Sequence, residues 1–97
     1  MKRKNIPYAR QSINNLDINA VVKVLKSDMI TQGSVNTDFE SYVSRYCNSK
    51  YALSFNSATS ALHGACKALG VGNNDIVWTS PVTFVSTANS VIYCGAR

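Results

Sequence analysis

The first half of the chain carries apolar residues at helical spacing. Between residues 16 and 25 these are Leu16, Ile18, Val21, Val22 and Leu25. They predict a helix from about Leu16 to Lys26, with Asn14 or Asn15 as its N-cap. The pattern stops at residues 29–34, where Gly33 is free to take a positive φ angle, so we expect a loop there.

A second helical face follows this loop. Its apolar members are Phe39, Val43, Tyr46 and Cys47. Thr37 and Glu40 have the spacing of a capping box, in which a hydroxyl and a carboxylate each accept a hydrogen bond from a backbone amide. We therefore expect a helix that starts at Thr37 and ends near Asn48.

The second half of the chain alternates between strand-like and helical patterns. Apolar residues have a period of two in Tyr51–Phe55, and a second strand is predicted at Ile76–Thr79. A helical pattern follows each of them, from the Asn56–Ser60 junction to Gly70 and over about Thr83–Tyr93. The order strand, helix, strand, helix predicts an α/β fold, with an open sheet of parallel strands and helical crossovers.

Composition narrows the classes of protein that fit. The 97 residues, 45% hydrophobic and 15% charged, are enough for one small domain and argue against disorder. No apolar run approaches the roughly 20 residues of a membrane span, and no secretory signal follows the basic start, so we expect a cytoplasmic protein that binds no membrane. The net charge of +5 comes mainly from scattered basic residues, which disfavours a nucleic-acid partner. The three cysteines match no zinc or redox spacing, and we expect reduced thiols.

The Asn56–Ser60 junction is the most informative segment for function. A strand that ends at a helix start presents unpaired amides, the positive end of the helix dipole and here the hydroxyls of Ser57, Thr59 and Ser60. This combination suits a phosphate group, and the same residues also fit a role limited to capping the helix. Phe84 lies near the end of the second predicted strand, where a core position is the alternative. We find no self-contained set of catalytic side chains.

Four blocks stand in a characteristic order along the chain. They are Ile30–Gly33, Phe39–Glu40, Phe55–His63 and Thr79–Asn89. Their order and spacing resemble the DegT/DnrJ/StrS family of nucleotide-sugar aminotransferases, from about Ile6 to Ala96. Within the family, the chain is most similar to the members that aminate C4 of a UDP-linked 4-keto-6-deoxy amino sugar in pseudaminic acid biosynthesis.

The resemblance implies a fold, a cofactor and the residues that bind it. The fold is the large domain of the type I, aspartate aminotransferase-like fold, and the cofactor is pyridoxal 5′-phosphate. By resemblance, Ala58 and Thr59 meet the cofactor phosphate with Ser57 flanking them, and Phe84 stacks on the pyridine ring. On the substrate side the resemblance implies Tyr8, Asp28, Met29, Ile30 and Thr31.

The resemblance also implies partners and an incomplete site. The partners are a nucleotide-sugar substrate, an amino-acid donor such as glutamate, and a second copy in a homodimer. The family's Schiff-base lysine has no counterpart among these 97 residues. We therefore expect an N-terminal fragment, residues 1–97, with helices at 16–47 and the start of the cofactor-binding sheet at 51–95, poorly stable and inactive alone. Two alternatives remain open: a non-catalytic module that binds a phosphate ligand, and an interaction fragment whose strand edges pair with another chain.

Overall fold

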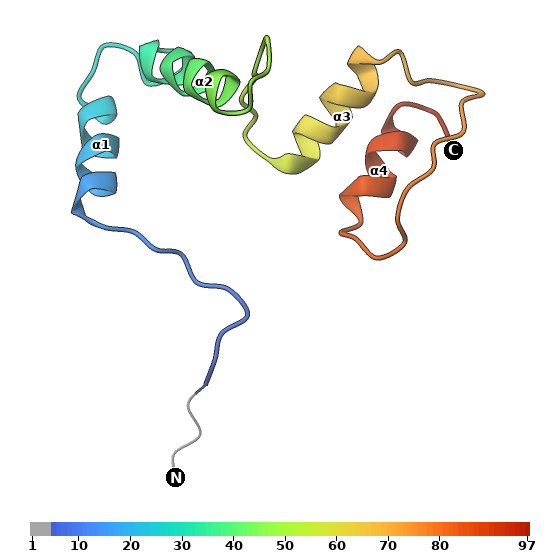
Figure 1. Ribbon diagram of the computed structural model, residues 1–97, viewed down its shortest axis with the longest axis horizontal. Helices are drawn as coiled ribbons and strands as arrows, with labels where there is room; N and C mark the ends of the chain where they lie inside the picture. Colours follow the sequence, from blue (N-terminus) through green and yellow to red (C-terminus); the bar gives the residue numbers. More distant parts are fainter. Residues whose placement is uncertain (1–4) are drawn as a thin grey trace. The chain divides into compact units, whose positions relative to one another are not determined.

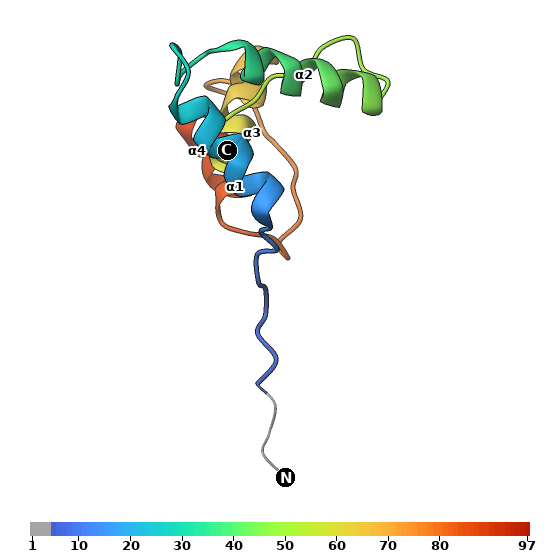
Figure 2. The same ribbon diagram turned by 90° about the vertical axis from the view of Figure 1, so that its left-hand side faces the viewer.

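The computed structural model describes residues 5–97, which contain four helices (Figure 1). Helix α1 spans Asn15–Leu25, α2 spans Ser34–Tyr46, α3 spans Ala58–Ala68 and α4 spans Ser86–Tyr93. Segments without regular structure join them, as Figure 2 also shows. The chain divides into two compact units, Met1–Phe39 and Glu40–Arg97, each of which is described by itself. Over residues 5–97, no helix has both the length and the apolar character that a bilayer crossing requires.

Helix α1 confirms the first predicted helix and identifies its cap. The side-chain oxygen of Asn14 accepts hydrogen bonds from the amides of Leu16 at 2.7 Å and Asp17 at 3.4 Å. In return the Asp17 carboxylate accepts from the Asn14 amide at 2.8 Å, which completes a capping box. Asn14, and not Asn15, is therefore the N-cap.

Helix α2 begins earlier than predicted. It starts at Ser34, and the amide of Asn36 donates to the Gly33 carbonyl at 3.1 Å. Thr37 therefore lies inside the helix and not at its start, so the capping box predicted at Thr37 and Glu40 is wrong. Glu40 lies inside the helix and not at its first turn. The predicted end is confirmed, because Asn48 has a left-handed φ of 50°, as is common for a residue just beyond a helix C-terminus.

Neither predicted strand forms within residues 5–97, where the regular secondary structure is helical, so the secondary structure by itself does not show the predicted α/β sheet. A strand requires backbone pairing with a neighbour, and the only such pairing in this part of the chain involves Arg97. The Arg97 amide donates to the Asp75 carbonyl at 3.1 Å, and its carbonyl accepts from the Val77 amide at 2.8 Å. Arg97 is thus hydrogen-bonded to the two residues that flank Ile76, which is the pattern of two parallel segments. Parallel pairing is also what the predicted sheet requires.

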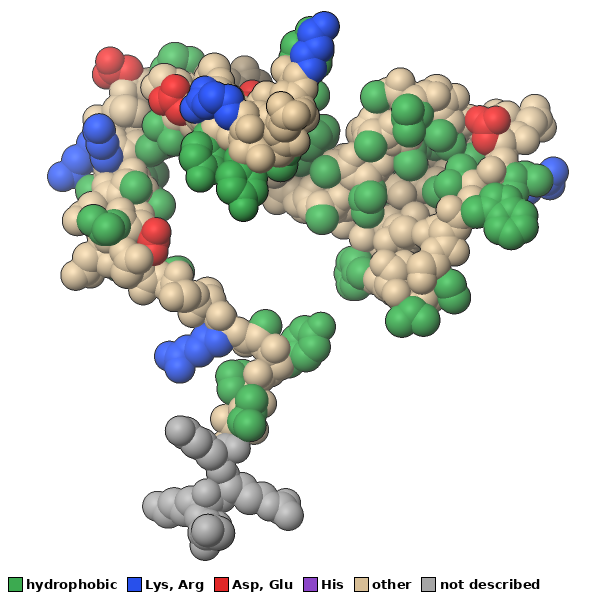
Figure 3. Space-filling view, in the orientation of Figure 1, with side chains coloured by type: hydrophobic (Ala, Val, Ile, Leu, Met, Phe, Trp, Pro, Cys, Tyr) green, Lys and Arg blue, Asp and Glu red, His purple; other side chains and the backbone are tan. Residues whose placement is uncertain are grey.

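The buried residues lie on α4 and just after it, where α4 packs against α3. These two helices pack against each other, and the residues buried on folding are Ser86, Ser90, Val91, Cys94 and Ala96. Ser90 is only 2% exposed, and its hydroxyl lies 4.0 Å from the sulfur of Cys66, so small side chains allow the helices to approach closely. Helices α1, α2 and α3 bury no residue, and hydrophobic side chains lie on the surface of each unit (Figure 3). The low stability expected from the sequence stays a prediction, and this small core supports it.

Candidate functional site

The start of α3 is built by Ser57. This residue has an extended backbone, with φ −158° and ψ 155°, and its hydroxyl accepts from the Ser60 amide at 3.2 Å. The Ser57 carbonyl accepts from the Ala61 amide at 3.1 Å, which closes the first turn. Ser57 is therefore a true N-cap, so the capping role weighed from the sequence is confirmed.

Capping does not use all the donors at this helix start. Ser57 serves Ser60, while the amides of Ala58 and Thr59 have no hydrogen-bond acceptor among the residues that the structure describes. The Thr59 hydroxyl also lacks a hydrogen-bond partner there. These three donors stand at the positive end of the helix dipole, where an anion is stabilised. We call Ser57, Ala58 and Thr59 the phosphate cradle, after the ligand predicted for them, because unused donors at a helix start suit an anion. Their role in binding a cofactor stays a prediction.

The segment that leads into the cradle is held from two helices. One carboxylate oxygen of Glu40 accepts from both the amide and the hydroxyl of Ser54, each at 2.8 Å. On the other side, the ring of Phe55 lies against α3 at Gly64, where an added Cβ would be 3.0 Å from two ring carbons. Gly64 is therefore needed for this close contact between ring and helix.

Phe84 lies at the other predicted junction, just before α4. Its side chain is 73% exposed, so the core position weighed as an alternative is wrong in this structure. The hydroxyls of Thr83 and Thr87 are 3.0 Å apart and link the turn that carries Phe84 to the first turn of α4. Helices α3 and α4 run side by side in the same direction (Figure 1), so Phe84 lies at the same end of this pair as the cradle.

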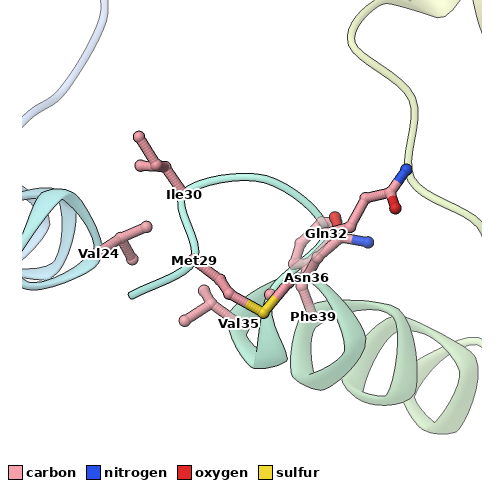
Figure 4. A pocket seen from close by; sticks show the side chains of 8 residues that line it. Val24, Met29, Ile30, Gln32, Val35, Asn36 and Phe39 are labelled. Atoms are coloured by element: carbon pink, nitrogen blue, oxygen red, sulfur yellow. The ribbon is translucent and has the colours of Figure 1, made fainter. Parts of the chain in front are cut away.

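The loop between α1 and α2 forms a hollow of about 380 Å³ (Figure 4). Met29 and Ile30, two of the predicted substrate residues, line it, and Met29 reaches from the loop toward α2. Gln32, and not Gly33, has the positive φ, of 52°. Gly33 is required for space instead, because an added Cβ would be 3.0 Å from the Met29 carbonyl oxygen.

The structure does not bring all the predicted substrate residues together. Asp28 lines a neighbouring hollow together with Lys23 and Asp38. Thr31 is exposed and lines neither hollow. Tyr8 is fully exposed in an irregular segment before α1 and lines neither hollow. The roles predicted for these residues stay predictions.

Other lining residues of the first hollow were not anticipated from the sequence. They are Val24 from α1, Val35, Asn36 and Phe39 from α2, and Gln32 from the loop. The helical pattern places Phe39 on an apolar face, whereas Val24 was not among the apolar positions of the first predicted helix, and no local signal shows that both residues lie at one loop. The result is an apolar wall with two side-chain amides at its edge (Figure 4).

The remaining candidate groups point to no second site. In the described part of the chain no three His, Cys, Asp or Glu side chains are grouped to hold a metal, and Cys47, Cys66 and Cys94 are free thiols. His63 lies 5.6 Å from the ring of Tyr93, in an edge-to-face arrangement. Its Nε2 atom is buried and has no hydrogen-bond partner within residues 5–97.

One protein family matches residues 11–97, the DegT/DnrJ/EryC1/StrS aminotransferase family. The chain belongs to this family. The membership expected from the four sequence blocks is therefore confirmed. Strands are not formed within residues 5–97, so the support for the predicted α/β sheet of the large aminotransferase domain comes from this membership.

Curated aminotransferases are similar to nearly the whole chain. A UDP-4-amino-4,6-dideoxy-N-acetyl-beta-L-altrosamine transaminase of Campylobacter jejuni is 44% identical over 92 residues, which are 95% of this chain and 24% of that protein. A UDP-4-amino-4-deoxy-L-arabinose–oxoglutarate aminotransferase of Shewanella sediminis is 36% identical over 97 residues, 100% of this chain and 25% of that protein. The chain thus spans about a quarter of the length of these relatives.

A solved structure shows the same local architecture. An aminotransferase from Psychrobacter cryohalolentis matches with a TM-score of 0.84 and 32% sequence identity, over 93% of this chain and 24% of that one. The backbone of this chain is therefore similar to part of an aminotransferase.

Proposed function

We propose that this chain binds the phosphate and the ring of pyridoxal 5′-phosphate, and that the whole protein is an aminotransferase for a UDP-linked 4-keto-6-deoxy amino sugar. The observation that carries the proposal is the pair of unused amides, those of Ala58 and Thr59, at the capped start of α3 in a member of an aminotransferase family. The names of the relatives in Campylobacter jejuni and Shewanella sediminis support a UDP-sugar substrate.

The residues of the cradle would divide the work of binding. The Ser57 hydroxyl holds the first turn through Ser60, so that the amides of Ala58 and Thr59 are already oriented when a phosphate arrives. Such donors hold an anion without ordering a long side chain, which keeps the entropic cost of binding low. The exposed ring of Phe84 offers a flat face to the pyridine ring, a contact worth about 0.5–1.5 kcal/mol. When bound, the cofactor supplies the electron sink that amino transfer requires.

The substrate side of the proposal rests on the hollow beside the loop. Met29 and Ile30 would contact the nucleotide sugar there, and we assign Tyr8, Asp28 and Thr31 to the same role. Glutamate as the amino donor and a homodimer with sites at its interface complete the proposed enzyme. The apolar wall can pack against the face of a flat group, and the amides at its edge can form hydrogen bonds with the polar atoms of that group. This combination supports a flat, polar group as the occupant.

A fluorescence titration with pyridoxamine 5′-phosphate tests the cofactor site. This probe carries an amine in place of the aldehyde, so lysine side chains cannot react with it. We expect it to bind more tightly than pyridoxamine, which lacks the phosphate. Thr59→Val should weaken only the phosphorylated probe, by about tenfold for one lost hydrogen bond to a charged group. Phe84→Leu should weaken both probes, because it removes the stacking face and not a phosphate contact.

Two results would reject this reading. Equal affinity for the two probes would show that the cradle holds no phosphate. Binding of inorganic phosphate as tight as that of pyridoxamine 5′-phosphate, without any effect of Phe84→Leu, would favour the alternative of a simple phosphate-binding module.

A further inference from the structure

The carboxylate of Glu40 has a role that its sequence position conceals. Its spacing from Thr37 suggested a helix cap, but α2 begins at Ser34 and leaves this side chain inside the helix. One of its oxygens instead accepts from both the amide and the hydroxyl of Ser54, which is 14 residues away, at 2.8 Å each. Both bonds are partly buried, and bonds to an ionised acceptor are about twice as strong as neutral ones.

This bond lies on the path into the phosphate cradle. Ser54 stands three residues before Ser57. In the part of the chain that the structure describes, it is the one residue between 51 and 56 whose backbone amide is hydrogen-bonded. Within residues 5–97 the pairing that would hold this segment as a strand is not formed, and the Glu40 carboxylate is a polar tether of the segment.

The neighbouring residue restrains the opposite side of the same segment. Phe55 lies against α3 at Gly64, whereas Ser54 is bonded to Glu40 of α2. Successive side chains of an extended segment point in opposite directions, so the two contacts hold the chain from both sides. The backbone that arrives at Ser57 is therefore restrained in position before the cap forms.

We propose that Glu40 is a positioning residue for the phosphate cradle. Its carboxylate does not contact the ligand but holds Ser54, so that Ser57 caps α3 and the amides of Ala58 and Thr59 stay oriented. The identity of the ligand, the phosphate of pyridoxal phosphate, rests on the function proposed above. Without the tether, binding has to order the segment first, and the affinity falls accordingly.

Four variants of the purified protein test this role. Glu40→Gln keeps the size of the side chain and removes its charge. Ser54→Ala removes the hydroxyl bond and keeps the amide bond, so it is a milder change for the case in which Glu40→Gln does not fold. Asp38→Asn is the matched control, because Asp38 is an exposed carboxylate of the same helix and makes no hydrogen bond among residues 5–97. The double variant at Glu40 and Ser54 measures their coupling.

The first readout needs no ligand. Amide hydrogen exchange reports the bonds that Ser57 makes to the amides of Ser60 and Ala61. We expect Glu40→Gln to accelerate exchange at both amides by about tenfold, while the Leu69 amide at the far end of α3 is unchanged. A purely structural role would accelerate exchange at all three together. Unchanged exchange at Ser60 and Ala61, or an equal effect of Asp38→Asn, would overturn the proposal.

The second readout is the affinity for pyridoxamine 5′-phosphate relative to pyridoxamine. Glu40→Gln, which replaces a charged acceptor by a neutral one, should weaken binding of the phosphorylated probe by about tenfold and Ser54→Ala by less. The double variant should lose clearly less than the two single losses combined, because both changes weaken the same contact. If the unaltered protein does not bind the phosphorylated probe, the proposed function fails, and hydrogen exchange still decides whether Glu40 positions the start of α3. If the unaltered protein binds it and Glu40→Gln binds it equally well, the positioning role fails and the proposed function stands.

Discussion

Replacing Ser57 by aspartate separates the two tasks of the α3 start. Aspartate caps a helix about as well as serine, and its charge at the helix N-terminus adds about 0.3–1 kcal/mol. The Ser57→Asp variant should therefore be at least as stable as the unaltered protein. Ser57→Ala, in contrast, loses the acceptor of the Ser60 amide and should lower the free energy of unfolding by about 1 kcal/mol.

The effect on ligand affinity has the opposite order. The carboxylate of Ser57→Asp would stand beside a phosphate that carries a charge of about −2. Ser57 is exposed, so the dielectric constant is close to that of water, where two unit charges about 4 Å apart interact by about 1 kcal/mol. The repulsion is then about 2 kcal/mol, which is a loss of roughly 30-fold in affinity. Ser57→Ala leaves the amides of Ala58 and Thr59 in place and should lose less than about tenfold.

Thermal unfolding and titration with pyridoxamine 5′-phosphate measure the two quantities on the same samples. The loss in Ser57→Asp should shrink at high salt, because the charges are exposed and screened. Binding of the phosphorylated probe to Ser57→Asp with unaltered affinity would refute the reasoning, since the phosphate could then not lie at the start of α3.

Two further predictions concern stability. Gly95→Ala should destabilise the protein more than Gly70→Ala, although both glycines have left-handed φ angles, of 83° and 78°, that cost other residues about 1–2 kcal/mol. A Cβ at Gly95 would also overlap the side-chain oxygen of Asn73, whereas a Cβ at Gly70 would have no neighbouring atom within 4 Å. Equal losses of unfolding free energy in urea for the two variants would contradict a role of this overlap. Asn14→Ala should lower stability by about 1 kcal/mol, because two amides of α1 lose their acceptor. Asn15→Ala is the control, and an equal loss of helical circular dichroism in both variants would argue against the cap.

Features that depend on a few neighbouring residues could be predicted from the sequence. The cap at Asn14, the cap at Ser57 and the helix end near Asn48 are examples, since each depends on residues within three or four positions. The same local reasoning predicted that amides at the start of α3 have no acceptor within the helix, because such amides follow from helix geometry alone. The four sequence blocks that identified the family needed no structure either.

Features that depend on distant partners could not be predicted in this way. The spacing of Thr37 and Glu40 fits a capping box, but the nearness of Ser54 gives the carboxylate a different partner. The period of two at Tyr51–Phe55 indicates strand preference, yet a strand exists only where another segment pairs with it. The exposure of Phe84 likewise depends on what packs around it.

The sequence by itself determined the four helices, the family and the capped start of α3, because these depend on periodicity, capping and residue order. Only the tertiary structure decided that Glu40 holds Ser54 and that Met29 lines a hollow. It also decided that Arg97 pairs in parallel with the segment around Ile76. The physical reason is that a hydrogen bond or an apolar contact between distant residues depends on where the chain returns in space, and no local pattern encodes that position.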